Sequence, residues 1–157
     1  MFDHVDISLE NTRVPNGTAK DLQQECEAHE AAIAACGGMD VQLLGIGPNG
    51  HIGFNEPGTP FTSKTQVVDL DPSTIEANSR FFNSMEDVPK QAISMGIETI
   101  MNSKEILLLI SGANKAEALQ KLLTSDVTEE IPATVLKTHP HVTVIADEAA
   151  YALVDHE

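Results

Sequence analysis

Four side chains that could transfer or hold a proton lie close together in one glycine-rich stretch, residues 45–58. They are one imidazole, one carboxylate and two carboxamides, and they belong to His51, Glu56, Asn49 and Asn55. An imidazole titrates near neutral pH, and a carboxylate can fix its tautomer and stabilise its protonated form. This set therefore predicts general acid–base chemistry. The alternative that the residues leave open is a loop histidine that only satisfies backbone carbonyls.

The position of this stretch in the chain favours a ligand site. The apolar residues 41–44 predict a buried strand that ends at Gly45. The glycines that follow let the backbone turn sharply and approach a ligand, and the site loop that we predict includes Gly45, Gly47 and Gly50. In an open α/β sheet, ligands bind beyond the carboxyl ends of the strands, where this loop would lie.

Residues 45–50 also match the G-x-G-x-x-G pattern of dinucleotide-binding sites, with Asp69 and Asp71 about 20 residues further on. That pattern works because a helix begins inside it and places its N-terminus against the pyrophosphate. Residues 51–58 contain two glycines and a proline and have no helical periodicity. The sequence therefore argues against a dinucleotide site.

The elements that would position the loop alternate along the chain. We expect strands at 65–70, 92–95, 105–110 and 142–146, and helices at 21–35, 97–102, 115–123 and 148–154. Another helix begins at Pro72, with Asp71 as its N-cap. A short element is expected at 135–136. This order is typical of a mostly parallel sheet with helices on both faces, in one domain over residues 1–157.

Composition and charge narrow the partners. The 157 residues carry a formal net charge of −15, which repels phosphate backbones and anionic lipid, so neither nucleic acid nor membrane is an expected partner. Any phosphorylated ligand must be held by a few basic residues. Neither a signal sequence nor a membrane-length apolar run is evident, which predicts a cytoplasmic protein. Cys26 and Cys36 lie ten residues apart along a predicted helix and are expected to be free, buried thiols.

The stretch Gly-Ile-Gly-Pro-Asn-Gly-His-Ile-Gly-Phe-Asn-Glu-Pro-Gly resembles the signature of the glucosamine-6-phosphate deaminase (isomerase) family. Segments 1–7, 76–82, 88–96 and 111–116 are similar to family segments as well, so the resemblance covers essentially the whole chain. The Phe-Asn-Glu-Pro ending is specific, because the related 6-phosphogluconolactonase family shares the glycines and the histidine but lacks it. The resemblance implies a three-layer Rossmann-like α/β fold.

The resemblance also implies an activity: conversion of glucosamine 6-phosphate and water into fructose 6-phosphate and ammonia, in amino-sugar catabolism, with no metal or organic cofactor. Carried over by position, His51 opens the pyranose ring by proton transfer at the ring oxygen, and Glu56 and Asn49 order the imidazole. Arg80 and Lys115 bind the phosphate, where two cations give orientation and affinity. Without the resemblance, Arg80 would be interpreted as a surface ion pair and Lys115 as a solvated lysine.

Several positions depart from the family pattern. Many members have Asp where this chain has Asn49, and a carboxamide cannot balance the charge of an imidazolium. Gln66 and Val68 stand where allosterically activated members carry basic residues, so activation by a second amino-sugar phosphate is not expected. The resemblance is compatible with a homo-oligomer, since the family includes monomers and hexamers. It also leaves open whether the substrate is the glucosamine or the galactosamine phosphate.

Family members extend further on the N-terminal side. There they carry a glycine-rich Ser/Thr turn for the phosphate and an aspartate that moves a proton between C1 and C2, and residues 1–50 supply neither. We therefore expect an N-terminally incomplete member with an unpaired sheet edge and impaired activity. Two alternatives stay open: a catalytically silent sugar-phosphate binding or oligomerisation domain, and a sugar lactonase resembling 6-phosphogluconolactonase.

Overall fold

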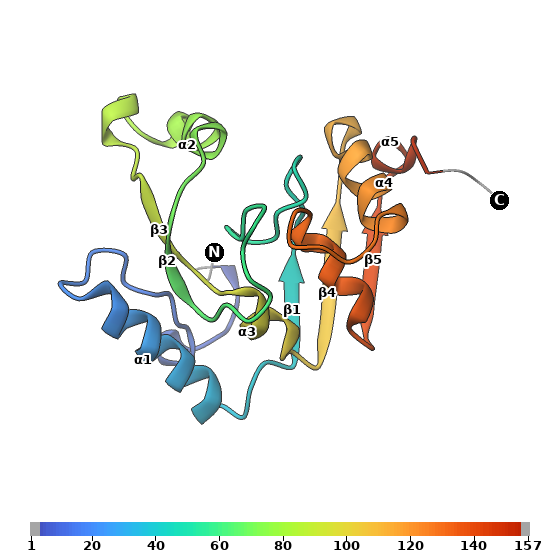
Figure 1. The fold of residues 1–157 in the computed structure, drawn as a ribbon. Coiled ribbons are helices and arrows are strands. Elements are labelled where there is room, and N and C mark those ends of the chain that lie inside the picture. The colour runs from blue at the N-terminus through green and yellow to red at the C-terminus, as the bar shows by residue number, and fades with distance from the viewer. Residues whose placement is uncertain (1–3, 155–157) are drawn as a thin grey trace.

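The strands form two separate sheets in a computed structural model that describes residues 4–154. Three parallel strands lie in the order β1–β4–β5, and β2 and β3 form an antiparallel ribbon (Figure 1). Their bounds are β1 Val41–Leu44, β2 Gln66–Asp69, β3 Gln91–Ser94, β4 Glu105–Ile110 and β5 Val142–Ala146. The prediction of an α/β fold with a mostly parallel sheet is confirmed, and each predicted strand lies within about two residues of its observed position.

Four of the five helices begin and end within one residue of the positions that the sequence signals gave or have the predicted start; the last begins at Glu148 as predicted but ends at Tyr151, three residues before the predicted end. Their bounds are α1 Leu22–Ala35, α2 Pro72–Asn78, α3 Ile97–Met101, α4 Ala116–Thr124 and α5 Glu148–Tyr151. The Asp21 side chain accepts a hydrogen bond from the backbone of Gln24 and caps α1, which ends before two glycines with φ of +84° and +91°. Asp71 caps α2, with Pro72 in its first turn, as predicted. Short 3₁₀ helices complete the chain: η2 Leu9–Asn11, η3 Ser79–Phe81, η4 Met85–Asp87, η5 Ala113–Lys115 and η6 Pro132–Thr138.

The core lies on one face of the parallel sheet. Alternate strand residues point into it, and α3, α4 and η6 supply the opposing side chains. Its members share near-complete burial and aliphatic character; they include Leu44, Ile106, Leu108, Ile110, Ile97, Ile100, Leu119, Leu122, Val135 and Leu136. A buried aliphatic cluster of this size fixes the register of β1 and β4, and with it the point at which each strand delivers its following loop.

Three expectations need correction. Helices were expected on both faces of the parallel sheet, but in the described residues they cover only one. The evidence is that alternate residues of β1 and β4, on the other face, are exposed or half-buried. The 3₁₀ run η6 stands where only a two-residue element was expected. Both cysteines are free as predicted, but only Cys26 is buried; Cys36 is exposed, because it caps the end of α1 next to the turn.

The described residues include no helix long and apolar enough to cross a membrane. In Figure 1 the loop after β1 lies at the carboxyl-terminal edge of the parallel sheet, with the β2–β3 ribbon on one side and α4 and α5 on the other. Segments 71–87 and 111–116 reach the same end of the molecule from these two sides. The three parts of the sequence to which site residues were assigned therefore lie toward one end of the molecule.

Candidate active site

The loop after β1 is fixed by its own backbone and by the segment at η6. The Gly47 N–H donates to the His51 carbonyl over 2.9 Å, and the Gly50 N–H donates to the Gly47 carbonyl over 3.0 Å. Outside the loop, Ala133 N–H donates to the Gly50 carbonyl over 2.9 Å. Gly50 has φ of +86°, and a Cβ there would lie 2.6 Å from the Ile131 side chain, so only glycine fits this turn.

The imidazole of His51 faces a carboxylate. Its Nδ1 lies 3.1 Å from Oε1 of Glu56, although the carboxylate is out of line with the ring N–H. The contact is therefore a close approach and not a linear hydrogen bond, and it becomes an ion pair when the imidazole is protonated. Both side chains are about four-fifths covered, at 20% and 24% exposure, which strengthens their mutual attraction relative to a surface pair. The geometry leaves Nε2 as the ring atom that can meet a ligand.

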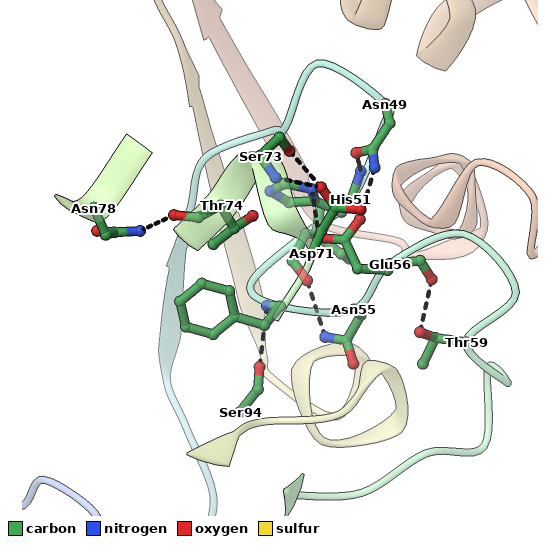
Figure 2. A network of polar contacts seen from close by, with 12 residues as sticks. Asn49, His51, Asn55, Glu56, Thr59, Asp71, Ser73, Thr74, Asn78 and Ser94 are labelled. Carbon is green, nitrogen blue, oxygen red and sulfur yellow. Dashed lines mark hydrogen bonds and ion pairs between the residues drawn. The ribbon is translucent and has the colours of Figure 1, made fainter. Parts of the chain in front are cut away.

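Asn49 acts on Glu56 and on the backbone, and not on the ring as the sequence suggested. Its Nδ2 donates to Oε2 of Glu56 over 2.6 Å, and its Oδ1 accepts from the His51 backbone N–H over 3.2 Å (Figure 2). A carboxamide can do both because it carries a donor and an acceptor, which an ionised carboxylate cannot. Asn49 thus orients the carboxylate that faces the imidazole.

Gly47 lies directly against the imidazole. A Cβ at this position would overlap three atoms of the His51 ring, although the backbone of Gly47 is in a region that other residues can adopt. The glycine is therefore required by the close approach of the ring and not by its own φ. This is the role of Gly47 that the motif alone could not assign.

Two bonds tie the loop to the end of the β2–β3 ribbon. Asn55, which is fully buried, donates from Nδ2 to the carbonyls of Ile52 and Met95, each over 2.9 Å. The Phe54 N–H donates to the Ser94 hydroxyl over 3.1 Å. Asn55 lies in the same loop as the predicted catalytic residues, and these contacts make it a structural residue that joins two parts of the chain.

A second carboxylate near the imidazole was missed by the sequence analysis. Asp71, the N-cap of α2, lies beside the group formed by His51 and Glu56 in Figure 2. Hydrogen bonds from the hydroxyl and the backbone N–H of Ser73 lower the pKa of Asp71, and the nearby His51 adds a smaller effect in the same direction. Its proximity to His51 depends on the path of β2 and could not be read from spacing.

Lys115 is held by a turn that a distant aspartate organises. Gly112 opens this turn with φ of +94°, and its N–H donates to the Asp147 carboxylate over 2.9 Å. The Ser111 hydroxyl donates to the same carboxylate over 2.6 Å. Burial lowers the pKa of the Lys115 ammonium, and among the described residues this ammonium has no ion-pair or hydrogen-bond partner. A half-buried cation without a partner is available to an anionic ligand.

Arg80 lies in η3, beyond α2, and is exposed. Its guanidinium stacks over the ring of the adjacent Phe81 at 4.8 Å from the centroid. Arg80 makes no ion pair among the described residues. The alternative interpretation, that Arg80 serves in a surface salt bridge, therefore has no partner in that part of the chain. The structure therefore groups His51, Glu56 and Asn49 by direct contact, whereas Arg80 and Lys115 belong to two other elements, η3 and η5, and stay predicted phosphate ligands.

Comparisons with known proteins agree on one family. The family model described as glucosamine-6-phosphate isomerases/6-phosphogluconolactonase matches residues 1–145. A glucosamine-6-phosphate deaminase of Shouchella clausii is 64% identical over 150 residues, which are 96% of this chain and 61% of the relative. One of Oceanobacillus iheyensis is 60% identical over 150 residues, 96% of this chain and 60% of that relative.

Solved structures place the fold in the same group. A structure described as a monomeric glucosamine-6-phosphate deaminase matches with a TM-score of 0.93 and 52% identity, covering 97% of this chain and 63% of that chain. A 6-phosphogluconolactonase from Trypanosoma cruzi matches with a TM-score of 0.64 at 20% identity, a likeness of fold alone. This chain thus spans about three fifths of the length of the relatives that it matches.

Proposed function

This chain belongs to the glucosamine-6-phosphate isomerase/6-phosphogluconolactonase family, and from this premise we propose that it acts in the conversion of glucosamine 6-phosphate and water into fructose 6-phosphate and ammonia. The observation that supports this most is the His51–Glu56 pair, 3.1 Å apart, at the carboxyl end of β1. It combines an acid–base group with the Phe-Asn-Glu-Pro sequence that sets deaminases apart from lactonases. We place this reaction in the cytoplasm.

His51 carries the first step. Its protonated imidazole gives the proton from Nε2 to the ring oxygen of the sugar as the bond from that oxygen to C1 breaks. The C1 hydroxyl gives up its proton to water in the same step, which leaves the open-chain amino aldehyde. Glu56 faces Nδ1 and stabilises the charged ring before the transfer, and Asn49 keeps the carboxylate in that orientation. Water then takes the proton from C2 and a proton is returned to C1, while the amine loses a proton and O1 gains one, which gives the imine of the keto sugar. A water molecule adds to C2 of this imine, and the bond from C2 to nitrogen breaks to release ammonia.

Lys115 and Arg80 hold the phosphate. A phosphate dianion is repelled by a chain of net charge −15, so binding needs local cations that are not already neutralised. The Lys115 ammonium is half-buried and without a partner among the described residues, and Arg80 offers the planar donors that suit a phosphate. Two cations on separate elements would fix both the position and the direction of the sugar.

Ammonia release from glucosamine 6-phosphate tests the proposal. We expect this chain to release ammonia, at a lower rate than the Shouchella clausii relative, and to release none from glucose 6-phosphate, which has no amine. His51→Gln is expected to lower the rate by about 10²- to 10⁴-fold, the usual effect of removing an acid–base group, while binding of the sugar phosphate is kept.

Two outcomes would contradict the proposal. An unchanged rate in His51→Gln would show that the imidazole is not the acid. Binding of glucosamine 6-phosphate without any ammonia release would support the alternative of a catalytically silent sugar-phosphate binding domain. Calorimetric titration of the sugar phosphate, run beside the ammonia assay on the same preparation, separates these results.

A further inference from the structure

A short segment after α4, residues 128–134, holds the loop after β1 at two separate points. At the first, the Ala133 N–H donates to the Gly50 carbonyl over 2.9 Å. At the second, the Gly58 N–H donates to the Glu129 carbonyl over 2.8 Å. We call residues 128–134 the brace. The imidazole and the carboxylate of the proposed acid–base pair lie between these two points of attachment along the chain.

The Glu129 side chain adds a third attachment. Its Oε1 accepts a hydrogen bond from the Phe61 N–H over 3.1 Å, and the Phe61 side chain packs against the core. Between these attachments, the Glu56 carbonyl accepts hydrogen bonds from the N–H and the hydroxyl of Thr59, over 3.0 and 2.7 Å. The turn that follows Glu56 is therefore closed on itself and tied to the brace, so the brace limits where the Glu56 carboxylate can lie.

One buried hydroxyl organises the brace. Thr134 is fully buried, and its Oγ1 accepts a hydrogen bond from the Thr128 N–H over 2.9 Å. The same oxygen lies 2.7 Å from the Ile131 carbonyl and 3.1 Å from the Thr128 carbonyl, to which its proton can be donated. Val135 and Leu136, which follow in η6, belong to the core and anchor this turn. Loss of the hydroxyl would leave buried backbone groups unpaired, which is costly, so the shape of the brace depends on it.

We propose that Thr134 and Glu129 are positioning residues, which set the separation of His51 and Glu56 through the brace. They act through the backbone of the loop on either side of this pair. A displacement of about 1 Å at a reacting group can cost about 10²-fold in rate, so the brace should control proton transfer while the two cations still bind the phosphate. The effect on rate rests on the proposed function, whereas the hold on the loop is measured without turnover.

Thr134→Val tests the hold, because it keeps the shape of the side chain and removes the hydroxyl. Thr99→Val is the matched control: Thr99 is also buried, at 4% exposure, and its hydroxyl donates to Glu30 over 2.7 Å, outside the brace. Amide hydrogen exchange is followed by NMR at Gly50 and Gly58 and along β4. In Thr134→Val we expect exchange about tenfold faster or more at the two glycines and unchanged in β4; in Thr99→Val the glycines should not change.

Turnover is measured on the same proteins. In Thr134→Val, kcat for ammonia release should fall about tenfold or more, while the calorimetric Kd for glucosamine 6-phosphate stays within about twofold. Thr134→Ser restores the hydroxyl and should recover the rate. Glu129→Ala should lower kcat by about two- to fivefold, because it removes only the bond to the Phe61 N–H. Its control is Glu130→Ala, since the Glu130 side chain makes no hydrogen bond among the described residues.

The exchange data decide between positioning and general stability. Equal acceleration in the loop and in β4 of Thr134→Val would show a global loss of stability and overturn the proposal, as would an equal fall in kcat in Thr99→Val. If Thr134→Val does not fold, the glutamate pair decides: faster exchange at Gly58 in Glu129→Ala than in Glu130→Ala supports the proposal, and equal exchange overturns it. An unsubstituted chain that releases no ammonia would contradict the proposed function, and the exchange result would still test the brace.

Discussion

The loop after β1 and the arm formed by β2, α2, η3 and β3 hold their predicted site residues in opposite ways. In the loop, His51 is held by a carboxylate, a glycine without room for a side chain and backbone bonds to η6. In the arm, Arg80 contacts only its neighbour Phe81 among the described residues, and the surrounding Phe82 and Met85 are exposed. One region fixes its functional group before any ligand binds, and the other does not.

This difference follows from what each group has to do. Proton transfer needs the imidazole within hydrogen-bond distance of one particular atom, so its position must be set in advance. A guanidinium that binds a phosphate can approach from several directions, and the arm can order around it when the ligand arrives. Precise positioning of a functional group is therefore concentrated at the end of β1 in this molecule. Substitutions in the two regions should therefore differ in size of effect.

Gly47→Ala should have the largest effect, although it adds one methyl group. The new Cβ overlaps the His51 ring and forces the imidazole out of its position, so ammonia release should fall about 10²- to 10⁴-fold, as in His51→Gln. Gly17→Ala is the matched control, because no atom lies within 4 Å of a Cβ there. A Gly47→Ala variant with the wild-type rate would show that the imidazole is not pre-positioned.

Lys115→Met should weaken binding of glucosamine 6-phosphate by about 10- to 100-fold, the loss expected for a charged hydrogen bond. The same change should raise the Tm of the free chain at neutral pH. Burial lowers the pKa of Lys115, so its charged form costs stability at any pH below that pKa, and the gain from Met should shrink as the pH rises toward the ordinary lysine range.

Lys121→Met on the exposed side of α4 controls for the loss of a positive charge. Calorimetry and thermal unfolding measure both quantities on the same samples. Weaker binding together with a lower Tm for Lys115→Met would mean that Lys115 stabilises the fold, and would remove it from the phosphate site.

Phe81→Ala should have a smaller effect, a two- to fivefold rise in the Kd for glucosamine 6-phosphate. The ring supports the Arg80 guanidinium through a cation–π contact of about 0.5–1 kcal/mol at an exposed site. Phe82→Ala tests whether any aromatic loss on the arm has the same result. A change of more than tenfold for Phe81→Ala would contradict the view that Arg80 is positioned by the ligand and not by the arm.

Asp147→Asn should have the smallest effect, a modest loss of thermal stability at neutral pH. Hydrogen bonds, first from the Ser111 hydroxyl and then from backbone N–H groups, lower the pKa of Asp147 in the folded chain. Its contribution is complete above the ordinary aspartate pKa of about 3.9 and is lost as the pH falls through the lowered value. The Tm values of the unsubstituted chain and of Asp147→Asn should therefore converge in acid. Asp126→Asn, a change at an exposed residue outside these hydrogen bonds, is the control and should leave the Tm at neutral pH unchanged.

The sequence predicted the elements and the His51–Glu56 approach where local pattern determines structure. The end of β1, the capping by Asp71 and the turn at Gly37 follow from strand periodicity and turn chemistry, and all are present. His51 and Glu56 are only five positions apart in a glycine-rich loop, and this short separation accounts for their proximity. These are short-range features, so they need no knowledge of the tertiary fold.

What the sequence could not predict depends on contacts between distant segments. The orientation of the Asn49 amide required the position of Glu56, and the approach of Asp71 to His51 required the path of β2. Asn55 could be assigned its structural role only once Met95 was seen beside it. The spacing of polar residues indicates which groups a loop carries but not which of them meet.

The turn at Gly50 also affects where the protein deamidates during storage. Asparagine followed by glycine is the pair most prone to deamidation, in which the next backbone nitrogen attacks the side-chain amide, and the chain has two such pairs, Asn16-Gly17 and Asn49-Gly50. In the second, the Gly50 N–H is bonded to Gly47 and the Asn49 amide is bonded to Glu56, so the attacking nitrogen and its target are both held. Asn16 lies in an exposed turn, where its Oδ1 accepts hydrogen bonds from the N–H and the hydroxyl of Thr18, but the attacking N–H of Gly17 has no hydrogen-bond partner among the described residues. Stored protein should therefore gain its first extra negative charge at position 16, and the amide beside the imidazole should survive for as long as the fold does.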